Sequence, residues 1–144
     1  FRRVLFRSGV FVGPDAIAMP LTLEGARAAG ATLGSGVVML FDETADLPGA
    51  LRRIAAFFRD ESCGQCVPCR VGTVRQEELL ARLERTIAAG GTPDPGQVVL
   101  LRELGQAMRD ASICGLGQAA SNPLSSVIKY FPDLFPAPRA AAAE

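Results

Sequence analysis

The four cysteines of this chain constrain its fold more than any other feature. Three of them, Cys63, Cys66 and Cys69, stand in one short segment at two-residue spacing, and the fourth, Cys114, lies far downstream. A C-x2-C-x2-C triplet directs three thiolates toward one small object, and a remote cysteine can complete its coordination. This pattern is typical of a [4Fe–4S] cluster and indicates electron transfer. Because Cys114 is the only other cysteine, we expect a single cluster.

The residues alone leave three alternatives open. A structural zinc site with four cysteines usually has two C-x2–4-C pairs. The three-plus-one arrangement therefore favours the cluster, and a zinc-stabilised interaction module is the main rival. A redox-active C-x-x-C pair would leave two cysteines unexplained. The chain could also be an inert fragment that never binds metal. Cys114 by itself could be a small buried apolar residue, so its assignment depends on its being the only thiol left.

The residues around the triplet suit a negatively charged group. Gly64 has no side chain where the loop must bend tightly, and Pro68 stiffens the approach to Cys69. A helix expected to begin near Arg70 would direct its free N–H groups and the positive end of its dipole toward the sulfurs. Together with Arg70, these donors should stabilise the cluster and raise its reduction potential.

Composition excludes several classes of function. The chain has no histidine, which removes the commonest general base, and we predict no catalytic residue. Its 15 basic and 15 acidic residues balance, without a basic run, so no nucleic-acid partner is expected. The longest strictly apolar runs, 37–41 and 54–58, are too short to cross a bilayer, so no direct membrane insertion is expected. With no visible signal peptide, the predicted location is cytoplasmic, where clustered cysteines bind metal more often than they form disulfides.

Hydropathy patterning predicts an α+β chain with a small mixed segment first. Residues 10–12 and 37–41 are short β-type runs, and residues 22–29 between them form a helix, with Thr22 as its cap and Gly30 as its stop. Two strands and one helix are too little for an independent core. We therefore expect this segment either to complete a domain whose other strands are missing or to pack against the helices that follow.

From Asp46 onward the apolar residues recur at helical spacing. The first predicted helix ends at 60–62, the second spans about 70–89, and Asp94-Pro95 and Asn122-Pro123 are start signals for two more. Four such helices with short connections predict a four-helix bundle. We also assign four phenylalanines to its core. The predicted core positions are Leu51, Ile54, Ala55, Phe57, Phe58, Leu79, Leu80, Leu83, Ile87, Val98, Leu101, Leu104, Met108, Leu124, Val127, Ile128, Phe131 and Phe135.

Two segments carry a resemblance to a known family. Residues 61–72 read E-S-C-G-Q-C-V-P-C-R-V-G, and residues 112–117 read S-I-C-G-L-G. Both resemble the C-terminal part of the NADH-binding flavoprotein subunit of respiratory complex I. The soluble relatives of that subunit are the diaphorase subunits of bidirectional hydrogenases and the beta subunits of NAD-dependent formate dehydrogenases. Residues 57–79 look closest to the formate dehydrogenase beta subunit. Residues 1–7 depart from the family pattern.

The resemblance implies a fold and a role for each part of the chain. Residues 1–43 would be part of an SLBB-like β-grasp domain, residues 44–135 a helical bundle, and residues 136–144 a flexible tail. In the family, the cysteines that match Cys63, Cys66, Cys69 and Cys114 ligate a [4Fe–4S] cluster. FMN and NAD(H) bind in an upstream domain that these 144 residues lack.

The expected function is therefore electron relay within an NAD-linked oxidoreductase complex, without catalysis by this piece alone. Single electrons would pass between the FMN and clusters in partner iron–sulfur subunits. We would place the chain in the subunit of an NAD-dependent formate dehydrogenase. The alternatives are the NADH-binding subunit of complex I and a hydrogenase diaphorase subunit. A complex I subunit would be peripheral to the membrane.

Overall fold

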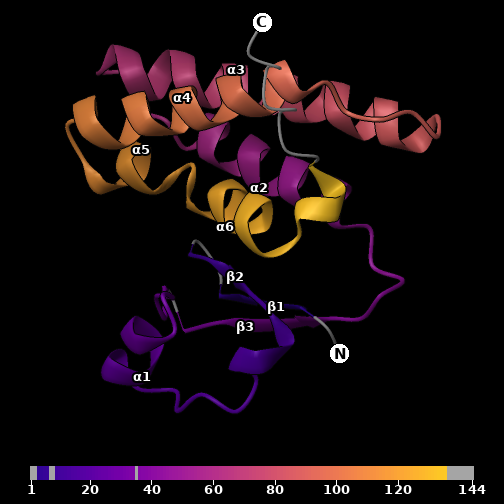
Figure 1. The fold of residues 1–144 in the computed structure, drawn as a ribbon. Helices are drawn as coiled ribbons and strands as arrows, with labels where there is room; N and C mark the ends of the chain where they lie inside the picture. Colours follow the sequence, from indigo (N-terminus) through magenta and orange to yellow (C-terminus); the bar gives the residue numbers. More distant parts are fainter. Residues whose placement is uncertain (1–2, 7–8, 35, 136–144) are drawn as a thin grey trace, which may run out of the picture.

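The computed structural model describes residues 3–6, 9–34 and 36–135, and in these ranges the chain is a mostly helical α+β protein, as predicted. A small sheet with one short helix lies beneath a layer of longer helices (Figure 1). The predicted tail, 136–144, lies outside the described residues, as do residues 1, 2, 7, 8 and 35. The elements in chain order are β1 (Arg3–Phe6), β2 (Phe11–Val12), η1 (Pro14–Ala16), α1 (Leu23–Ala28), β3 (Val38–Phe41), α2 (Leu47–Asp60), α3 (Val67–Ala88), α4 (Pro95–Ala111), α5 (Gly115–Ala119), α6 (Asn122–Tyr130) and η2 (Pro132–Leu134).

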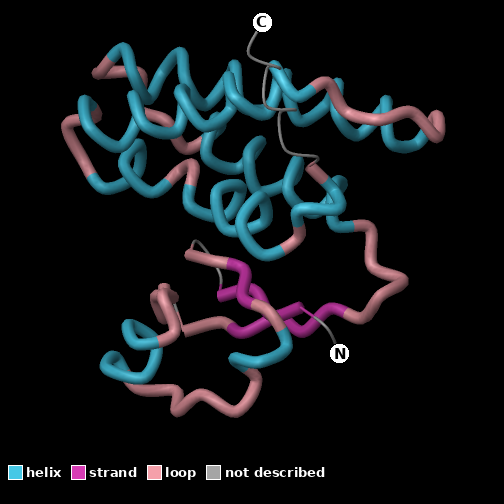
Figure 2. The backbone as a smooth tube through the Cα atoms, in the orientation of Figure 1, coloured by secondary structure: helices cyan, strands magenta, loops and turns pink. Residues whose placement is uncertain are grey.

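The described strands form a three-stranded antiparallel sheet in the order β2-β1-β3 (Figure 2). In the register of the sheet, Val4 of β1 lies opposite Val12 on one side and Leu40 on the other. The two predicted strands are present, although each is shorter than its apolar run, and β1 was not predicted. The helix α1 begins after Thr22, whose hydroxyl accepts a hydrogen bond from the Gly25 N–H at 3.0 Å, as the sequence indicated.

The sheet depends on the helices for its burial. Phe11 of β2 is fully buried within the main helical core, and its ring lies 5.9 Å from the ring of Phe41. Its N–H donates to the Ser126 hydroxyl of α6 at 2.8 Å. The N-terminal segment therefore packs against the helices, which is one of the two arrangements expected from its size.

Helix starts follow the sequence signals closely, with one correction. α2 begins after Asp46 and α4 after Asp94, and each carboxylate accepts a backbone N–H of the first turn. α3 begins at Val67 instead of near Arg70, because Pro68 fits the first helical turn, where no N–H is needed. Cys69 is therefore part of the helix, not of the loop before it.

The core prediction also needs one correction. Phe58 and Phe135 are buried and Phe131 is partly buried, but Phe57 is 46% exposed. Neighbouring residues on a helix point in different directions, so a single helix face accommodates only one of Phe57 and Phe58. The main core consists of Phe11, Leu47, Leu51, Ala55, Leu79, Leu80, Leu83, Val98, Leu101, Leu124, Val127, Ile128 and Phe135.

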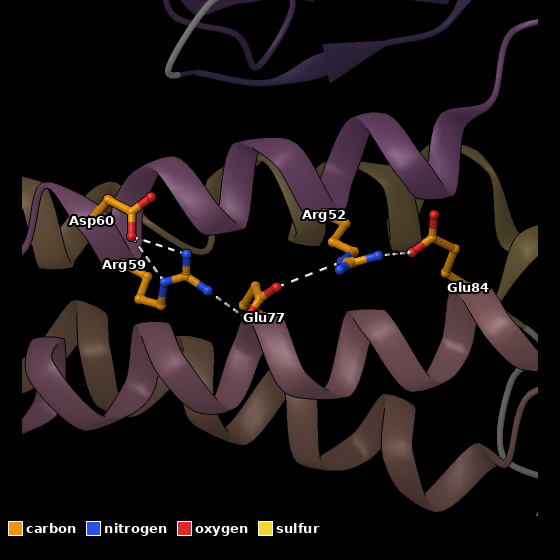
Figure 3. A network of polar contacts seen from close by, with 5 residues as sticks. All are labelled: Arg52, Arg59, Asp60, Glu77 and Glu84. Atoms are coloured by element: carbon orange, nitrogen blue, oxygen red, sulfur yellow. Dashed lines mark hydrogen bonds and ion pairs between the residues drawn. The ribbon is translucent and has the colours of Figure 1, made fainter.

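Charged side chains join α2 to α3 along their exposed side (Figure 3). Glu77 of α3 contacts two arginines of α2, Arg59 at 2.9 Å and Arg52 at 3.5 Å. Arg52 also reaches Glu84 at 2.9 Å, and Arg59 reaches Asp60 at 2.9 Å. Exposed ion pairs of this kind each contribute about 0–1 kcal/mol, so they support the register of the two helices more than their stability.

Replacing Asp46 by alanine should lower the free energy of unfolding by about 1 kcal/mol. The change removes the carboxylate oxygen that accepts the Gly49 N–H at 3.0 Å at the start of α2. The midpoint of urea unfolding, followed by circular dichroism, measures the loss. Asp46→Asn retains an acceptor oxygen and should lose much less. Equal losses in the two variants would contradict the capping role.

In the described part of the chain, no helix combines the length and the apolar character that a membrane span requires.

Candidate metal centre

All four cysteines line one small cavity of about 100 Å³. Cys69 is buried, Cys66 is half-buried, and Cys63 and Cys114 are exposed. The structure thus places the remote Cys114 at the same cavity as the triplet. The other residues that line the cavity are Glu61, Ser62, Gln65 and Leu116.

The triplet is shaped by a tight turn and a helix start. Gly64 has a φ of 76°, in the left-handed region that glycine adopts without strain, which confirms the predicted bend. The Arg70 guanidinium donates to the Gly64 carbonyl at 3.2 Å and so braces the turn. Cys66 is the extended residue that precedes α3, and Cys69 lies in the first turn of that helix. The two sulfurs therefore lie close to the positive end of the α3 dipole, where a thiolate is stabilised.

Two glutamine side chains hold the segment that carries Cys114 by donating hydrogen bonds to its backbone carbonyls. Cys114 is the extended residue immediately before α5, a short helix that the sequence did not predict. The Gln118 side chain donates to the Ser112 carbonyl at 3.0 Å and closes the turn between α4 and α5. Gln76, buried on α3, donates to the Ala120 carbonyl at 3.0 Å, which holds the end of this segment against α3.

Gly117 of α5 allows the two cysteine segments to approach closely. A methyl group at this position would overlap the Ser112 hydroxyl and would lie 2.8 Å from Cβ of Cys69. Real Cβ atoms essentially never approach that closely, so α5 can pack here only because residue 117 is glycine.

A second apolar cluster backs the cavity. Phe58, Met108 and Ala120 are buried together, and Leu116 packs against them while also lining the cavity. This side of the site is therefore closed to water, whereas Cys63 and Cys114 face the solvent. A group bound here would be buried on one side and accessible on the other.

Hydrogen-bonding groups lie beside two of the four sulfurs, those of Cys66 and Cys69. The pKa of the Cys66 thiol is lowered, mainly by the Ile113 backbone N–H, then by the Cys69 N–H, with a further contribution from the Ser112 hydroxyl. The Ser62 hydroxyl and the Cys69 thiol are hydrogen-bonded, with 3.3 Å between oxygen and sulfur. The surroundings of Cys66 thus favour its thiolate, the form in which cysteine ligates iron.

The lining of the cavity provides the ligands that a [4Fe–4S] cluster needs. Such a cluster is held by four thiolates, and four cysteines line the cavity, with N–H donors at Cys66. Among residues 3–6, 9–34 and 36–135, no three His, Cys, Asp or Glu side chains lie close enough together, as they stand, to hold a single metal ion.

Sequence reasoning missed the two serines that approach the sulfurs. Ser62 directly precedes Cys63, and Ser112 lies two residues before Cys114. A hydroxyl placed beside a predicted ligand in both segments is a signal that could have identified them, because donors near a thiolate tune its charge.

Comparisons with known proteins agree with this geometry. The family model for the NADH-ubiquinone oxidoreductase-F iron-sulfur binding region matches residues 49–138. An NADH-quinone oxidoreductase subunit of Mycobacterium bovis, designated F, is 37% identical over 115 residues, which are 80% of this chain and 25% of that protein. The mitochondrial NADH-ubiquinone oxidoreductase 51 kDa subunit of Neurospora crassa is 34% identical over 99 residues, which are 69% of this chain and 19% of that protein.

A crystal structure of an NAD+-reducing [NiFe]-hydrogenase in the H2-reduced state is similar in fold. It has a TM-score of 0.73 and 36% sequence identity, and the match covers 92% of this chain and 22% of that chain. The chain thus spans about a quarter of the length of the relatives it matches. The family model covers well over half of the chain, including all four cysteines. The chain therefore belongs to the NADH-ubiquinone oxidoreductase-F iron-sulfur binding family.

Proposed function

We propose that this chain is the electron-relay portion of an NAD-linked oxidoreductase subunit, and that Cys63, Cys66, Cys69 and Cys114 hold one [4Fe–4S] cluster. The observation that carries the proposal is the shared cavity: two segments about 45 residues apart in sequence place all four cysteines around it. Family membership supports the same conclusion.

The residues of the chain provide what such a relay needs. When bound, a [4Fe–4S] cluster supplies a one-electron carrier. The four thiolates hold it, and the N–H groups of Ile113 and Cys69 stabilise negative charge on the Cys66 sulfur. The apolar cluster of Phe58, Met108 and Ala120 keeps water from the inner side. The exposed outer side, at Cys63 and Cys114, would be the side nearer to a redox partner.

The finer assignments from the sequence belong to the same proposal. Helices α2, α3, α4 and α6 would form a four-helix bundle over residues 44–135. The sheet and α1, within residues 1–43, would be part of an SLBB-like β-grasp domain. In the complete subunit, FMN and NAD(H) would bind upstream, and other iron–sulfur subunits would exchange electrons with this chain in the cytoplasm. The assignment to formate dehydrogenase stays a prediction, since the relatives named above belong to NADH-quinone oxidoreductases and a hydrogenase.

Anaerobic reconstitution of the chain with iron and sulfide tests the proposal. We expect about four irons per chain and a broad visible absorption band that bleaches on reduction. Metal analysis of the same sample separates the alternatives, because zinc gives no colour. A folded chain that binds one zinc and no iron, or that binds neither metal, would contradict the proposal.

A further inference from the structure

A groove between α4 and α6 collects positive charge. It has a volume of about 410 Å³ and shares no lining residue with the cavity of the four cysteines. Three of its lining side chains are cationic and none is acidic. The residues that line it are Arg102, Gln106 and Arg109 of α4 and Ser125, Ile128 and Lys129 of α6.

The three cations of the groove are not neutralised within the described part of the chain. Across residues 3–6, 9–34 and 36–135, no ion pair joins any of them to a carboxylate. Arg109 donates to the Gln106 side chain at 3.2 Å, and the Lys129 ammonium lies 4.8 Å from the ring centre of Tyr130. Arg102 contacts neither a carboxylate nor a carbonyl there, so the groove keeps its full positive charge.

The nearby carboxylates lie elsewhere. Glu103 and Asp110 directly follow the two arginines of α4, yet neither lines the groove, because neighbouring residues on a helix point in different directions. Between α2 and α3 the arrangement is the opposite, since Arg52 and Arg59 are both paired with glutamates (Figure 3). Like charges that gather in one groove repel one another, and a ligand that brings negative charge relieves the repulsion.

The spacing of the cations indicates the kind of anion. Arg102 and Arg109 are seven residues apart on α4, which is about 10 Å along a helix, so their charges are distributed along the groove. A guanidinium binds a carboxylate with two parallel hydrogen bonds. Among the described residues that line the groove, none is aromatic, so a nucleotide base would have no side chain to stack on. An extended anion with several carboxylates fits these features better than a single small ion.

We propose that the groove between α4 and α6 binds an acidic polypeptide segment of a partner protein, with carboxylates spaced along α4. The groove does not involve the cluster, so the inference goes beyond the proposed function. Only the identification of the partner as another subunit of the oxidoreductase complex rests on that function. Exposed charges set the register and the rate of association more than the affinity, so this contact should be salt-sensitive.

A nuclear magnetic resonance titration of the isotope-labelled full chain with an octaglutamate peptide tests the proposal. At low ionic strength we expect saturable shifts of amide signals in α4 and α6, and the affinity should fall when salt is raised from about 20 mM to about 150 mM. An octaserine peptide should cause no such shifts. The triple variant Arg102→Gln, Arg109→Gln and Lys129→Gln should bind octaglutamate at least about tenfold more weakly, and Arg102→Gln alone about two- to threefold more weakly.

The matched control removes the same charge outside the groove. Arg53, Arg82 and Arg85 are exposed residues of α2 and α3 that do not line it. The triple variant Arg53→Gln, Arg82→Gln and Arg85→Gln should keep its affinity for octaglutamate within about twofold, because screening weakens the effect of distant charges.

Three results would overturn the proposal. They are an unmodified chain that does not bind octaglutamate at low salt, equal losses of affinity in the two triple variants, and inorganic pyrophosphate that binds the groove more tightly than the peptide does. The last result would assign the groove to small phosphate anions. None of them changes the iron content of the reconstituted chain, so the proposed function is tested separately.

Discussion

Cys114→Ser should leave the chain with clearly fewer than four irons after anaerobic reconstitution, which is the largest effect we expect of any single substitution. Cys114 is the only cavity-lining cysteine outside the triplet, and it stands at the start of α5 in an extended backbone that turns its side chain toward the cavity. A serine hydroxyl is a much poorer iron ligand than a thiolate, since it is not deprotonated near neutral pH. Colorimetric iron analysis and the visible spectrum measure the loss.

Ile113→Ser is the matched control for this substitution. It introduces the same side chain one residue earlier, at a position that is 74% exposed, and it retains the backbone N–H directed at Cys66. We expect it to bind about four irons. If Cys114→Ser binds as much iron as Ile113→Ser and its cluster is equally stable, Cys114 is not a ligand.

Gly117→Ala should lower both the stability of the chain and its iron content. The added methyl group would overlap the Ser112 hydroxyl and would lie 2.7 Å from Ser112 Cβ and 2.8 Å from Cys69 Cβ. Both neighbours are held by backbone hydrogen bonds, so relief requires α5 to move away from α3 and to carry Cys114 with it. Overpacking of this kind costs about 1–3 kcal/mol. The midpoint of urea unfolding and the iron content of the reconstituted chain report the two effects.

Gly115→Ala tests whether the effect is specific to that contact. Gly115 belongs to the same short helix, and a Cβ built there meets no atom within 4 Å. Alanine also favours helix over glycine by about 1 kcal/mol. We therefore expect Gly115→Ala to be neutral or mildly stabilising and to keep its iron. Equal losses in both variants would show that glycine is needed for the conformation of α5 and not for the approach to Cys69.

The parts of the fold that the sequence predicted well are those with strong local signals. Asp94-Pro95 marks the start of α4 because an aspartate cap and a proline in the first turn leave few alternatives, and Asp46 acts in the same way for α2. The helical apolar spacing identified most of the buried residues. Family membership was predicted from residues 61–72 and 112–117 and is confirmed.

Other parts had no signal of that strength. α5 has five residues, fewer than are needed to show a helical period, and β1 has only four, an arginine and three apolar residues that do not alternate with polar ones. The start of α3 was placed too late because Pro68 has two possible roles, stiffening a loop or beginning a helix. The close contact of Gly117, Ser112 and Cys69 depends on how α5 packs against α3, and no local pattern encodes that packing.

The burial of Phe11 has a consequence for how this region could be isolated. Phe11 lies well before residue 49, where the family match begins, yet its side chain is fully buried in the main core with residues of the helices, and its N–H donates to Ser126 of α6. Excision of the matched region alone would remove that ring and leave an apolar hole among the helices. The iron-sulfur region and the strand before it are therefore better regarded as one cooperative folding unit than as separable modules.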